Sequence, residues 1–286
     1  MRGKCVLITG ATNGIGKAAA LDLAKMGAEV LIVGRDEVKT RAVLQDLVSS
    51  SGNTKLDFLL GDLSSFDDVR AIAIEYLSRH DRLDVLLNNA GAAFSEFRAS
   101  ADGYEMTFAL NHISYYLLTL LLLDTLKKTA AERGEARIVN VSSSAHFSAR
   151  DGIRLDNLRD SGGSAGFRAY SNSKLANVLF TYQLARRLEG TGVAVNALHP
   201  GFVNTGFGHN MKGITGLAVK VLQRLIARTP EKGAETLVYL ASSSEVAGLT
   251  GKYWKDKTQE RSSEISYDRE QQRRLWEFSA AITGVE

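Results

Sequence analysis

A tyrosine and a lysine stand four residues apart in the segment AYSNSKLAN (169–177), as Tyr170 and Lys174. On a helix this spacing places both side chains on one face, with Cβ atoms about 5–6 Å apart. A phenol with an ordinary pKa of about 10 is a poor base at neutral pH unless a neighbouring cation favours the phenolate. The same spacing recurs at Tyr253 and Lys257, so spacing alone does not identify a catalytic pair.

Three glycines follow an apolar run in TGATNGIGK (9–17), as Gly10, Gly14 and Gly16. Their spacing is G-xxx-G-x-G and differs from the commoner G-x-G-x-x-G. Glycines permit a tight turn and let the backbone approach a pyrophosphate, which the N–H groups of a helix N-terminus bind. A glycine-rich turn without a ligand is the alternative. At a strand-to-helix junction the pattern favours a dinucleotide site.

The second apolar run ends in LIVGRD (31–36) and bears on which dinucleotide binds. An acid at this strand end would hold the ribose hydroxyls of NAD and repel the extra phosphate of NADP. Here Gly34 ends the strand and Arg35 follows, and a guanidinium suits a 2′-phosphate. Asp36 competes, because it lies about twenty residues past the last glycine of the motif. We place Asp36 at the cap of the next helix and predict NADP(H), with NAD(H) as the alternative.

The composition is that of a folded globular protein, with 286 residues, 44% hydrophobic, 23% charged and a net charge of +3. Acidic and basic residues are interspersed, which does not favour nucleic acid as a partner. The single cysteine, Cys5, excludes an intrachain disulfide and favours a reducing compartment, so we expect a cytoplasmic protein. The chain has two prolines and no Ser/Pro-rich linker. Residues 1–286 are therefore expected to form one domain.

Membrane insertion is not expected from the sequence. The most apolar stretch, residues 113–126, is too short to span a bilayer and contains Ser, Thr and Asp. A strand pattern starts at Lys4, where a leader would have a basic and then an apolar region. We therefore expect neither a signal peptide nor an N-terminal anchor.

Short β-branched runs alternate with longer helix-period patterns. This alternation, with near-continuous apolar strands, predicts a parallel sheet covered by helices on both faces. Ligands in such folds bind beyond the carboxyl ends of the strands, where the motifs fall. The expected strands are 5–10, 28–34, 56–62, 83–91, 136–144, 193–201 and 249–254, and the expected helices are 14–26, 36–50, 65–80, a long region ending near 130, 168–189, 214–228, 230–243 and 267–281.

Taken together, the motifs resemble the short-chain dehydrogenase/reductase family. The matching segments, in family order, are TGATNGIG, GDLSS (61–65), NNAG (88–91), LNH (110–112), VNVSS (139–143), YSNSK (170–174) and HPGFVNT (199–205). Segments such as LNHISYYLLT and YSNSKLANVLF look most like the retinol dehydrogenase-like branch. The resemblance implies a Rossmann-type, doubly wound parallel sheet of about seven strands. It also implies hydride transfer between a nicotinamide and an alcohol/carbonyl pair.

Position by position, the resemblance gives Tyr170 as the general acid of carbonyl reduction, or the base of alcohol oxidation. Lys174 would lower the pKa of Tyr170 and bind the nicotinamide ribose. Ser143 would hydrogen-bond the substrate oxygen, with Ser144 as a rival in register. Asn111 would support a water-linked proton path to Lys174.

The second tyrosine–lysine pair does not match the family pattern. Tyr253 and Lys257 fall on the last expected strand and its exit, where residues four apart lie about 13 Å apart along the chain. No serine or nucleotide motif accompanies them, so we interpret them as structural. His112 and His199 have no partners at metal-ligand spacing, so no metal is expected, and both are interpreted as packing or supporting residues.

The resemblance also assigns cofactor contacts. Asp62 and Leu63 would flank the adenine, the segment 89–91 would line the adenosine ribose, and Thr205 would bond the carboxamide. The residues expected to contact the cofactor are Gly10, Asn13, Gly14, Ile15, Gly16, Arg35, Asp62, Leu63, Asn89, Ala90, Gly91, Tyr170, Lys174, Pro200, Gly201 and Thr205.

Two segments bear on the substrate. Residues 145–167 separate Ser143 from Tyr170, and their Gly/Ser-rich end suggests a mobile flap over the pocket.

A capping segment is expected at about 202–228, within which the helix 214–228 has an apolar and a basic face. In the family this segment caps the pocket, which implies a hydrophobic substrate such as a retinoid, a lipid aldehyde or a ketone. Peripheral membrane docking and ordinary core packing are the alternatives.

Three further expectations concern activity and assembly. A ketoreductase for acyl or steroid substrates is the alternative enzyme. A non-catalytic dinucleotide-sensing protein is the alternative from another class, although the set Asn111, Ser143, Tyr170 and Lys174 argues against it. The family also implies a homodimer or homotetramer, formed through the helices at about 108–130 and 168–189.

Overall fold

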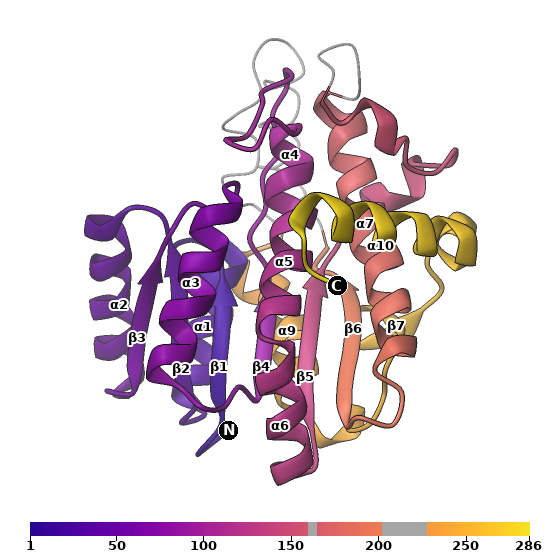
Figure 1. The fold of residues 1–286 in the computed structure, drawn as a ribbon. Helices are drawn as coiled ribbons and strands as arrows, with labels where there is room; N and C mark the ends of the chain where they lie inside the picture. The colour runs from indigo at the N-terminus through magenta and orange to yellow at the C-terminus, as the bar shows by residue number, and fades with distance from the viewer. Residues whose placement is uncertain (160–164, 202–227) are drawn as a thin grey trace.

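The computed structural model describes residues 1–159, 165–201 and 228–286, which form one α/β domain (Figure 1). Its sheet has eight strands in the order β3-β2-β1-β4-β5-β6-β7-β8, and only β7 and β8 pair antiparallel. The doubly wound parallel sheet is therefore confirmed, with one strand more than expected. The strands are β1 (Cys5–Thr9), β2 (Glu29–Gly34), β3 (Leu56–Leu60), β4 (Val85–Asn88), β5 (Ala136–Val141), β6 (Val193–His199), β7 (Lys252–Lys255) and β8 (Thr258–Glu260).

The additional strand, β8, had no signal in the sequence. After β7 the chain reverses at Asp256 and Lys257, whose φ angles of 50° and 62° lie in the left-handed region that tight hairpin turns use. All three residues of β8 are exposed, so no apolar alternation marks it. Tyr253 lies on β7 and Lys257 in the turn, so this pair does not share a helix face.

Helices cover both faces of the sheet, with α1, α2 and α9 on one face and α3, α5, α6, α7 and α10 on the other (Figure 1). The pleat of β1 sends Leu7 into one core and Ile8 into the other, which explains why the strand is apolar throughout. Each such burial contributes about 1.5–3 kcal/mol. The helices are α1 (Gly14–Lys25), α2 (Glu37–Ser51), α3 (Phe66–Arg79), α4 (Met106–Phe108), α5 (Ser114–Leu121), α6 (Leu123–Arg133), α7 (Gly166–Arg187), α9 (Pro230–Ser242) and α10 (Arg269–Thr283).

The long helical region that was expected to end near residue 130 is divided. A π-helical turn, η1 (Ala109–Ile113), joins α4 to α5, and a bend of 56° separates α5 from α6. Among the described residues no single helix is long and apolar enough to cross a membrane, although the two bent halves together meet that length and composition.

The C-terminal helix α10 lies across α5 and α7 (Figure 1). The ring of Trp276 on α10 has its centre 5.2 Å from that of Tyr116 on α5 and 6.0 Å from that of Phe180 on α7. The Tyr116 hydroxyl donates to the Val285 carbonyl oxygen at 2.9 Å. The C-terminal segment thus covers part of the helix face through which we expected the chain to dimerise.

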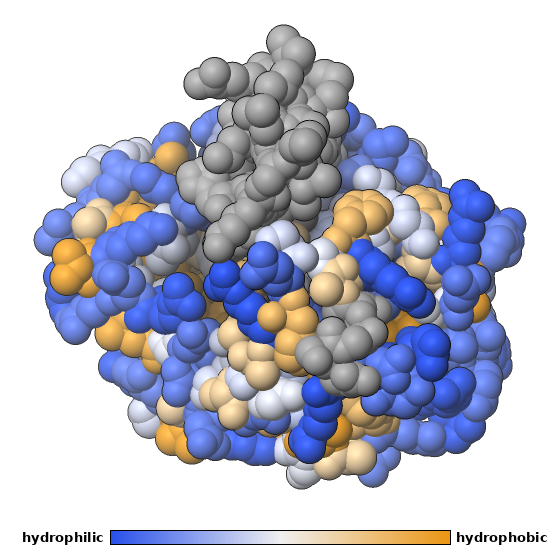
Figure 2. All heavy atoms as spheres, turned by 90° about the horizontal axis from the view of Figure 1, so that it is seen from above, coloured by the Kyte–Doolittle hydropathy of each residue, from blue (hydrophilic) through white to orange (hydrophobic). Residues whose placement is uncertain are grey.

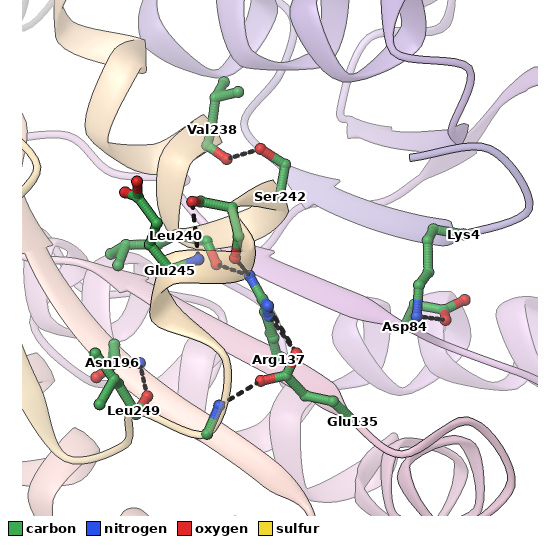
Figure 3. Close-up of polar contacts among 12 residues, drawn as sticks. Lys4, Asp84, Glu135, Arg137, Asn196, Val238, Leu240, Ser242, Glu245 and Leu249 are labelled. Atoms are coloured by element: carbon green, nitrogen blue, oxygen red, sulfur yellow. Dashed lines mark hydrogen bonds and ion pairs between the residues drawn. The ribbon is translucent and has the colours of Figure 1, made fainter.

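Polar contacts stabilise the amino-terminal end of the sheet (Figure 3). Arg137, on β5, donates to the carbonyl oxygens of Leu240 at 3.1 Å and Ser243 at 2.8 Å. The last carbonyls of a helix lack partners within the helix, so Arg137 caps α9 and ties it to the sheet. At the same end Lys4 and the buried Asp84 form an ion pair of 3.0 Å.

Candidate active site

The glycine turn between β1 and α1 packs against the backbone that follows β4. Gly10 has a φ of +67°, and a Cβ at this position would lie 2.6 Å from the Ala90 Cα atom. A Cβ at Gly16 would collide with the Asn89 side-chain amide and the Gly10 carbonyl oxygen. Only glycine fits these two positions, and the close approach fixes the shape of the turn.

Hydrogen bonds join the segment after β4 to this turn. Thr9 Oγ1 accepts from the backbone N–H groups of Asn89 at 2.9 Å and Ala90 at 3.1 Å. Asn89 Nδ2 donates to the carbonyl oxygens of Thr9 and Gly10 at 2.9 and 3.1 Å. Asn89 therefore holds the glycine turn in place, which the sequence did not reveal, while its contact with a ribose stays a prediction.

The start of α1 is suited to an anion. Asn13 stands at the N-cap position in an extended conformation, and its side chain makes no capping hydrogen bond. By contrast, Asp36, Ser65 and Asp268 cap α2, α3 and α10 with their side chains. The Asn13 side chain thus leaves the first N–H groups of α1 uncapped, beside a turn that admits close approach. This arrangement fits the pyrophosphate of a dinucleotide.

The end of β2 has no room for an acidic side chain. A Cβ at Gly34 would collide with the side chain of Thr40, which is fully buried. Asp36 accepts a hydrogen bond of 2.8 Å from the first turn of α2 and caps that helix, as predicted. The strand-end acid that would hold the ribose hydroxyls of NAD is therefore missing at Gly34.

Arg35 is an exposed cation at this edge of the sheet. Its side chain is 76% exposed and its guanidinium lies 3.1 Å from the Asp62 carboxylate. Burial raises the pKa of Asp62, but hydrogen bonds from Ser64 and Arg35 outweigh burial and bring the pKa below its ordinary value. Asp62 therefore stays ionised and holds Arg35 near the end of β2, and the neighbouring Leu63 is buried.

Tyr170 and Lys174 lie on α7 at the predicted helical spacing, with Lys174 Nζ 5.7 Å from the centre of the Tyr170 ring. Ser143 follows β5, and its side chain is hydrogen-bonded to Tyr170. Ser144 is exposed, and its backbone N–H donates to His199 Nδ1 at 3.2 Å. The structure therefore brings Ser143, and not Ser144, to the tyrosine.

Burial shifts the pKa of both α7 residues. It raises the pKa of Tyr170 to about 12, against a smaller lowering by the Ser143 hydrogen bond. It also lowers the pKa of Lys174 to about 7. We expected Lys174 to lower the pKa of Tyr170, but burial outweighs any such effect here, and Lys174 Nζ donates to the Val141 carbonyl oxygen at 3.0 Å.

Asn111 lies in the π-helical turn η1, close to Lys174. Its side chain pairs with the backbone of Ala92, accepting from the N–H and donating to the carbonyl oxygen, each at 2.9 Å. A Cβ at the exposed Gly91 would lie 3.1 Å from Asn111 Oδ1 and 3.3 Å from Lys174 Nζ. Gly91, without a Cβ, leaves the position between Asn111 Oδ1 and Lys174 Nζ open.

A buried polar ladder beneath the site was not predicted. Asn88 Nδ2 donates to Thr119 Oγ1 and to Asn140 Oδ1, and Asn140 Nδ2 donates to Thr181 Oγ1, each at 2.9 Å. The ladder joins β4 and β5 to α5 and α7, and all four side chains are fully buried. Such a network fixes the relative positions of these elements. Asn88 and Asn140 stand in the motifs NNAG and VNVSS, but the sequence gave them no role.

Three histidines surround the site, and burial lowers the pKa of each to about 4, so all are neutral. We expected His112 and His199 to be packing residues or to support the residues of the site. His146 was missed, although it lies three residues after Ser143. Its Nδ1 contacts the Ser143 carbonyl oxygen at 2.7 Å, and its Nε2 accepts from the Ser263 N–H at 3.0 Å. His146 thus ties the backbone of Ser143 to the segment before α10.

The remaining predicted residues lie at the end of β6 or outside the described residues. Pro200 is half-buried, and Gly201 has a φ of +86°, with Arg228 2.9 Å from where a Cβ would lie. Thr205 lies outside the described residues. The same is true of the expected capping segment 202–228 and its amphipathic helix, except for Arg228.

One group of potential metal ligands occurs among the described residues, away from the site. The ligand atoms of Cys5, Glu29 and His80 lie within 4.8 Å of one another. The Cys5 sulfur is 3.2 Å from the Tyr76 hydroxyl, and burial raises the pKa of the thiol to about 11. The group lies at the amino ends of β1 and β2, whereas Tyr170 lies beyond the carboxyl ends of the strands. It has no part in the chemistry of this site.

A cavity of about 740 Å³ also lies away from Tyr170. It is formed by the C-terminal end of α7, the start of α10 and the amino ends of β5 and β6, with Tyr182, Arg186 and Tyr267 among its lining residues. None of the predicted catalytic residues lines it. The candidate active site is therefore assigned by its side chains and their geometry, and not by the size of a cavity.

Comparisons with known proteins point to one family. The family model described as short chain dehydrogenase matches residues 4–155 and 159–213. Human retinol dehydrogenase 14 is 40% identical over 304 residues, covering 100% of this chain and 88% of that protein. Human polyprenol dehydrogenase is 38% identical over 284 residues, covering 99% of this chain and 86% of that protein.

Solved structures show the same fold. An uncharacterised protein from Mycobacterium paratuberculosis superposes with a TM-score of 0.78 at 29% identity, covering 100% of this chain and 95% of that one. The Pseudomonas aeruginosa RhlG/NADP active-site complex has a TM-score of 0.70 at 27% identity, covering 88% and 94%. The 3-ketoacyl-(acyl-carrier-protein) reductase from Brucella melitensis complexed with NADH has a TM-score of 0.68 at 26% identity, covering 88% and 96%. The two complexes hold different cofactors.

Proposed function

Since this chain belongs to the short-chain dehydrogenase family, we propose that it transfers hydride between NADP(H) and a hydrophobic alcohol/carbonyl pair. One observation carries this proposal. Ser143, Tyr170 and Lys174 lie together at the end of β5, next to the position that Gly91 leaves open. A dinucleotide bound at the glycine turn would reach this space from the end of β1. The direct test is consumption of NADPH with apolar carbonyl compounds.

The chain's own residues handle the proton. The nicotinamide supplies the hydride to the carbonyl carbon in reduction, or accepts it in oxidation. Tyr170 gives its hydroxyl proton to the carbonyl oxygen as the C–O double bond becomes single, and Ser143 donates a hydrogen bond to the same oxygen. A half-buried phenol with a raised pKa is protonated at neutral pH, which suits an acid in reduction.

Lys174 has the properties of a proton donor to the tyrosinate that this step leaves. Its pKa of about 7 lets it release and regain a proton near neutrality. Asn111 lies beside it, across the position that a Cβ of Gly91 would fill. We assign to Asn111 the support of the path along which water returns the proton. We propose the expected roles for Asn111, Ser143 and Tyr170, while Lys174 is reassigned from lowering the pKa of Tyr170 to returning its proton.

NADP(H) is favoured over NAD(H) by the end of β2. Thr40 leaves no room for an acidic side chain at Gly34, Asp36 is used as a helix cap, and Arg35 offers an exposed guanidinium. In the bound state Arg35 would contact the 2′-phosphate, while Asp62 holds it at this edge. A guanidinium that pairs with a phosphate is the usual device for this choice.

Replacing Arg35 with alanine is expected to raise the KM for NADPH about tenfold and to leave the KM for NADH unchanged. A charge-assisted hydrogen bond is worth about 1.5–3 kcal/mol, and the exposure of Arg35 places it at the lower end. The effect should shrink at high salt, because ions screen an exposed pair. Steady-state kinetics with both cofactors measures these KM values.

The matched control is Arg41→Ala, which replaces an exposed arginine of α2 that pairs with Glu37. An equal rise in the KM for NADPH and for NADH would contradict the proposed contact between Arg35 and the 2′-phosphate.

A hydrophobic substrate is supported by aromatic residues on both sides of the catalytic pair. Phe147, four residues after Ser143, is 45% exposed, and Phe167, three residues before Tyr170, is 57% exposed. Exposing aromatic rings costs hydration free energy unless a ligand covers them. Where Figure 2 shows described residues, the surface seen from above is largely hydrophilic, with separate hydrophobic groups. We therefore assign the substrate to apolar aldehydes, ketones and the corresponding alcohols.

The remaining alternatives follow from the same proposal. A ketoreductase acting on acyl or steroid substrates would use the same catalytic residues and differ only in substrate. We also propose a homodimer or homotetramer, with contacts that include surfaces other than the part of α5 and α7 that α10 covers. Peripheral membrane contact through residues 214–228 concerns a segment almost wholly outside the described residues.

A further inference from the structure

A chain of buried hydrogen bonds connects the C-terminal helix to the carbonyl groups around the site. Ser279 Oγ on α10 lies 3.3 Å from His112 Nε2, and His112 Nδ1 lies 3.2 Å from Asn177 Oδ1. Asn177 Nδ2 donates to the carbonyl oxygens of Asn111 at 3.0 Å and Val141 at 3.2 Å. The side chains of Ser279, His112 and Asn177 are all fully buried.

Asn177 and Lys174 converge on one acceptor. They are three residues apart on α7, so they share a face of the helix. The Val141 carbonyl oxygen accepts from Lys174 Nζ at 3.0 Å and from Asn177 Nδ2 at 3.2 Å. Val141 lies one residue past Asn140, where the pairing of β5 with β4 ends. Two side chains of α7 thus supply the donors at this carbonyl.

The Asn177 amide determines the proton position on His112, because Ser279 Oγ also lies 2.8 Å from the Leu275 carbonyl oxygen and its hydroxyl can donate or accept. Asn177 Nδ2 gives both hydrogens to carbonyl oxygens, so Asn177 Oδ1 faces the histidine and must accept from Nδ1–H. Burial lowers the pKa of His112 to about 4, so the neutral ring carries its single proton on Nδ1. The rings of Phe108 and Phe180 hold it from two sides, with centres 5.1 and 6.0 Å away.

We propose that His112 and Asn177 are positioning residues that orient Lys174 for proton transfer by fixing the carbonyl groups of Val141 and Asn111. This inference rests on the function proposed above. His112 fixes the orientation of the Asn177 amide, and that amide fixes the two carbonyls. Lys174 Nζ is then held by the Val141 carbonyl, 5.7 Å from the centre of the Tyr170 ring.

The physical reason is the precision that proton transfer needs. A displacement of about 1 Å in a reacting or orienting group costs up to about 100-fold in rate. With an apolar residue in place of Asn177, two buried carbonyl oxygens lose a donor and Lys174 Nζ loses a fixed acceptor. The titratable groups facing Lys174 Nζ are Tyr170 on α7 and Tyr115 on α5, with ring centres 5.7 and 5.9 Å away. A shift in the pH profile therefore reports on Lys174 and its two tyrosine neighbours.

The test compares four variants in NADPH-dependent reduction of an apolar aldehyde. Asn177→Leu removes the amide at similar volume, and His112→Phe removes the donor while keeping an aromatic ring. His112→Asn is the conservative variant, because its side-chain nitrogen occupies nearly the position of Nδ1. Asn53→Leu is the matched control, since Asn53 Nδ2 also donates to two backbone carbonyls, those of Ala24 and Ala28 at 2.9 and 2.8 Å, far from the site.

We expect kcat to fall by about 10- to 100-fold in Asn177→Leu and His112→Phe, with KM for NADPH within about threefold. The pH profile of kcat should shift in the same two variants. His112→Asn should restore kcat to within about threefold and recover the pH profile. Asn53→Leu should lower thermal stability without moving the pH profile. If Asn177→Leu does not fold, the two His112 variants decide the question.

Two kinetic results would overturn the inference: unchanged kcat and pH profile in folded His112→Phe, or a His112→Asn protein as impaired as His112→Phe. Failure of the proposed function is recognised separately, because wild type would then not oxidise NADPH with any apolar carbonyl. In that case the ¹⁵N NMR shifts of His112 still test the geometry. The wild-type ring should show Nδ1 protonated and Nε2 unprotonated at pH 7, and Asn177→Leu should lose this preference. The opposite tautomer in wild type would contradict the proposal.

Discussion

Replacing Tyr170 with phenylalanine is expected to lower kcat for NADPH-dependent carbonyl reduction by about 100- to 10,000-fold. This is the usual contribution of a general acid, and the only atom removed is the one that donates the proton. The binding of NADPH, followed by nicotinamide fluorescence, should change by less than about threefold, because we propose that the glycine turn and Arg35 supply most of the contacts to the cofactor. A loss of kcat without a loss of binding would place Tyr170 in the chemical step.

The control for this experiment is Tyr253→Phe. Tyr253 belongs to the second tyrosine–lysine pair, and its buried hydroxyl has no hydrogen-bond partner among the described residues. Its removal should leave kcat unchanged and leave stability equal or higher, since an unpaired buried hydroxyl is unfavourable. A Tyr170→Phe enzyme as active as wild type would contradict the catalytic assignment and favour the dinucleotide-sensing alternative.

Replacing Lys174 with methionine is expected to lower kcat/KM by about 100-fold or more, while the folded protein becomes equally or more stable near neutral pH. The loss of rate follows from the loss of the proton donor to Tyr170. The gain in stability follows from burial, which lowers the pKa of Lys174 to about 7 from its ordinary 10.5. Methionine has a similar length and no charge to desolvate.

The pH dependence of stability has a definite sign. Between pH about 7 and 10.5 the unfolded chain binds the lysine proton and the folded chain does not. The free energy of unfolding of wild type should therefore rise with pH across this window, and Lys174→Met should lack this rise. Thermal midpoints measured from pH 7 to 10 test this rise in stability.

The control is Lys257→Met, which removes a half-exposed lysine paired with Glu235 and should keep the rise in stability. A wild-type midpoint that falls over this window, relative to Lys174→Met, would contradict the burial argument.

Much of the site could be predicted from the sequence because its motifs are local. The glycine turn, the cap at Asp36 and the helical spacing of Tyr170 and Lys174 depend on residues a few positions apart. Backbone geometry alone then determines which side chains share a face or close a turn. The alternation of strands and helices predicts a parallel sheet, and parallel strands bring these local motifs to the same end of the sheet.

The features that the sequence did not reveal depend on contacts between distant segments. His146 acquires its role by accepting a hydrogen bond from Ser263, and His112 by meeting Asn177 on another helix. From the sequence alone, neither histidine can be distinguished from a packing residue. The direction of the Tyr170 pKa shift was also missed, because it depends on how much of the ring is buried and on where Lys174 Nζ points. Neither quantity is visible from a spacing of four residues.

Two larger features were missed for related reasons. The strand β8 is short and fully exposed, so it carries no hydrophobic pattern. The packing of α10 on α5 and α7 was also hidden, because an amphipathic helix indicates that it has a partner but not which one. The apolar side of α10 carries Trp276, whose ring meets Tyr116 and Phe180. The chain's own helix α10 therefore covers part of the two helices through which the family implies dimerisation.

The most direct measurement of the central claim is the rate of NADPH and NADH oxidation, followed by absorbance, with a panel of apolar aldehydes and ketones. We predict saturable oxidation of NADPH with at least one apolar carbonyl compound, and a kcat/KM for NADH at least about tenfold lower, since about 1.4 kcal/mol of selective binding gives that factor. NADH used as well as NADPH would contradict the role of Arg35. Oxidation of neither cofactor with any compound of the panel would contradict the proposed reaction itself.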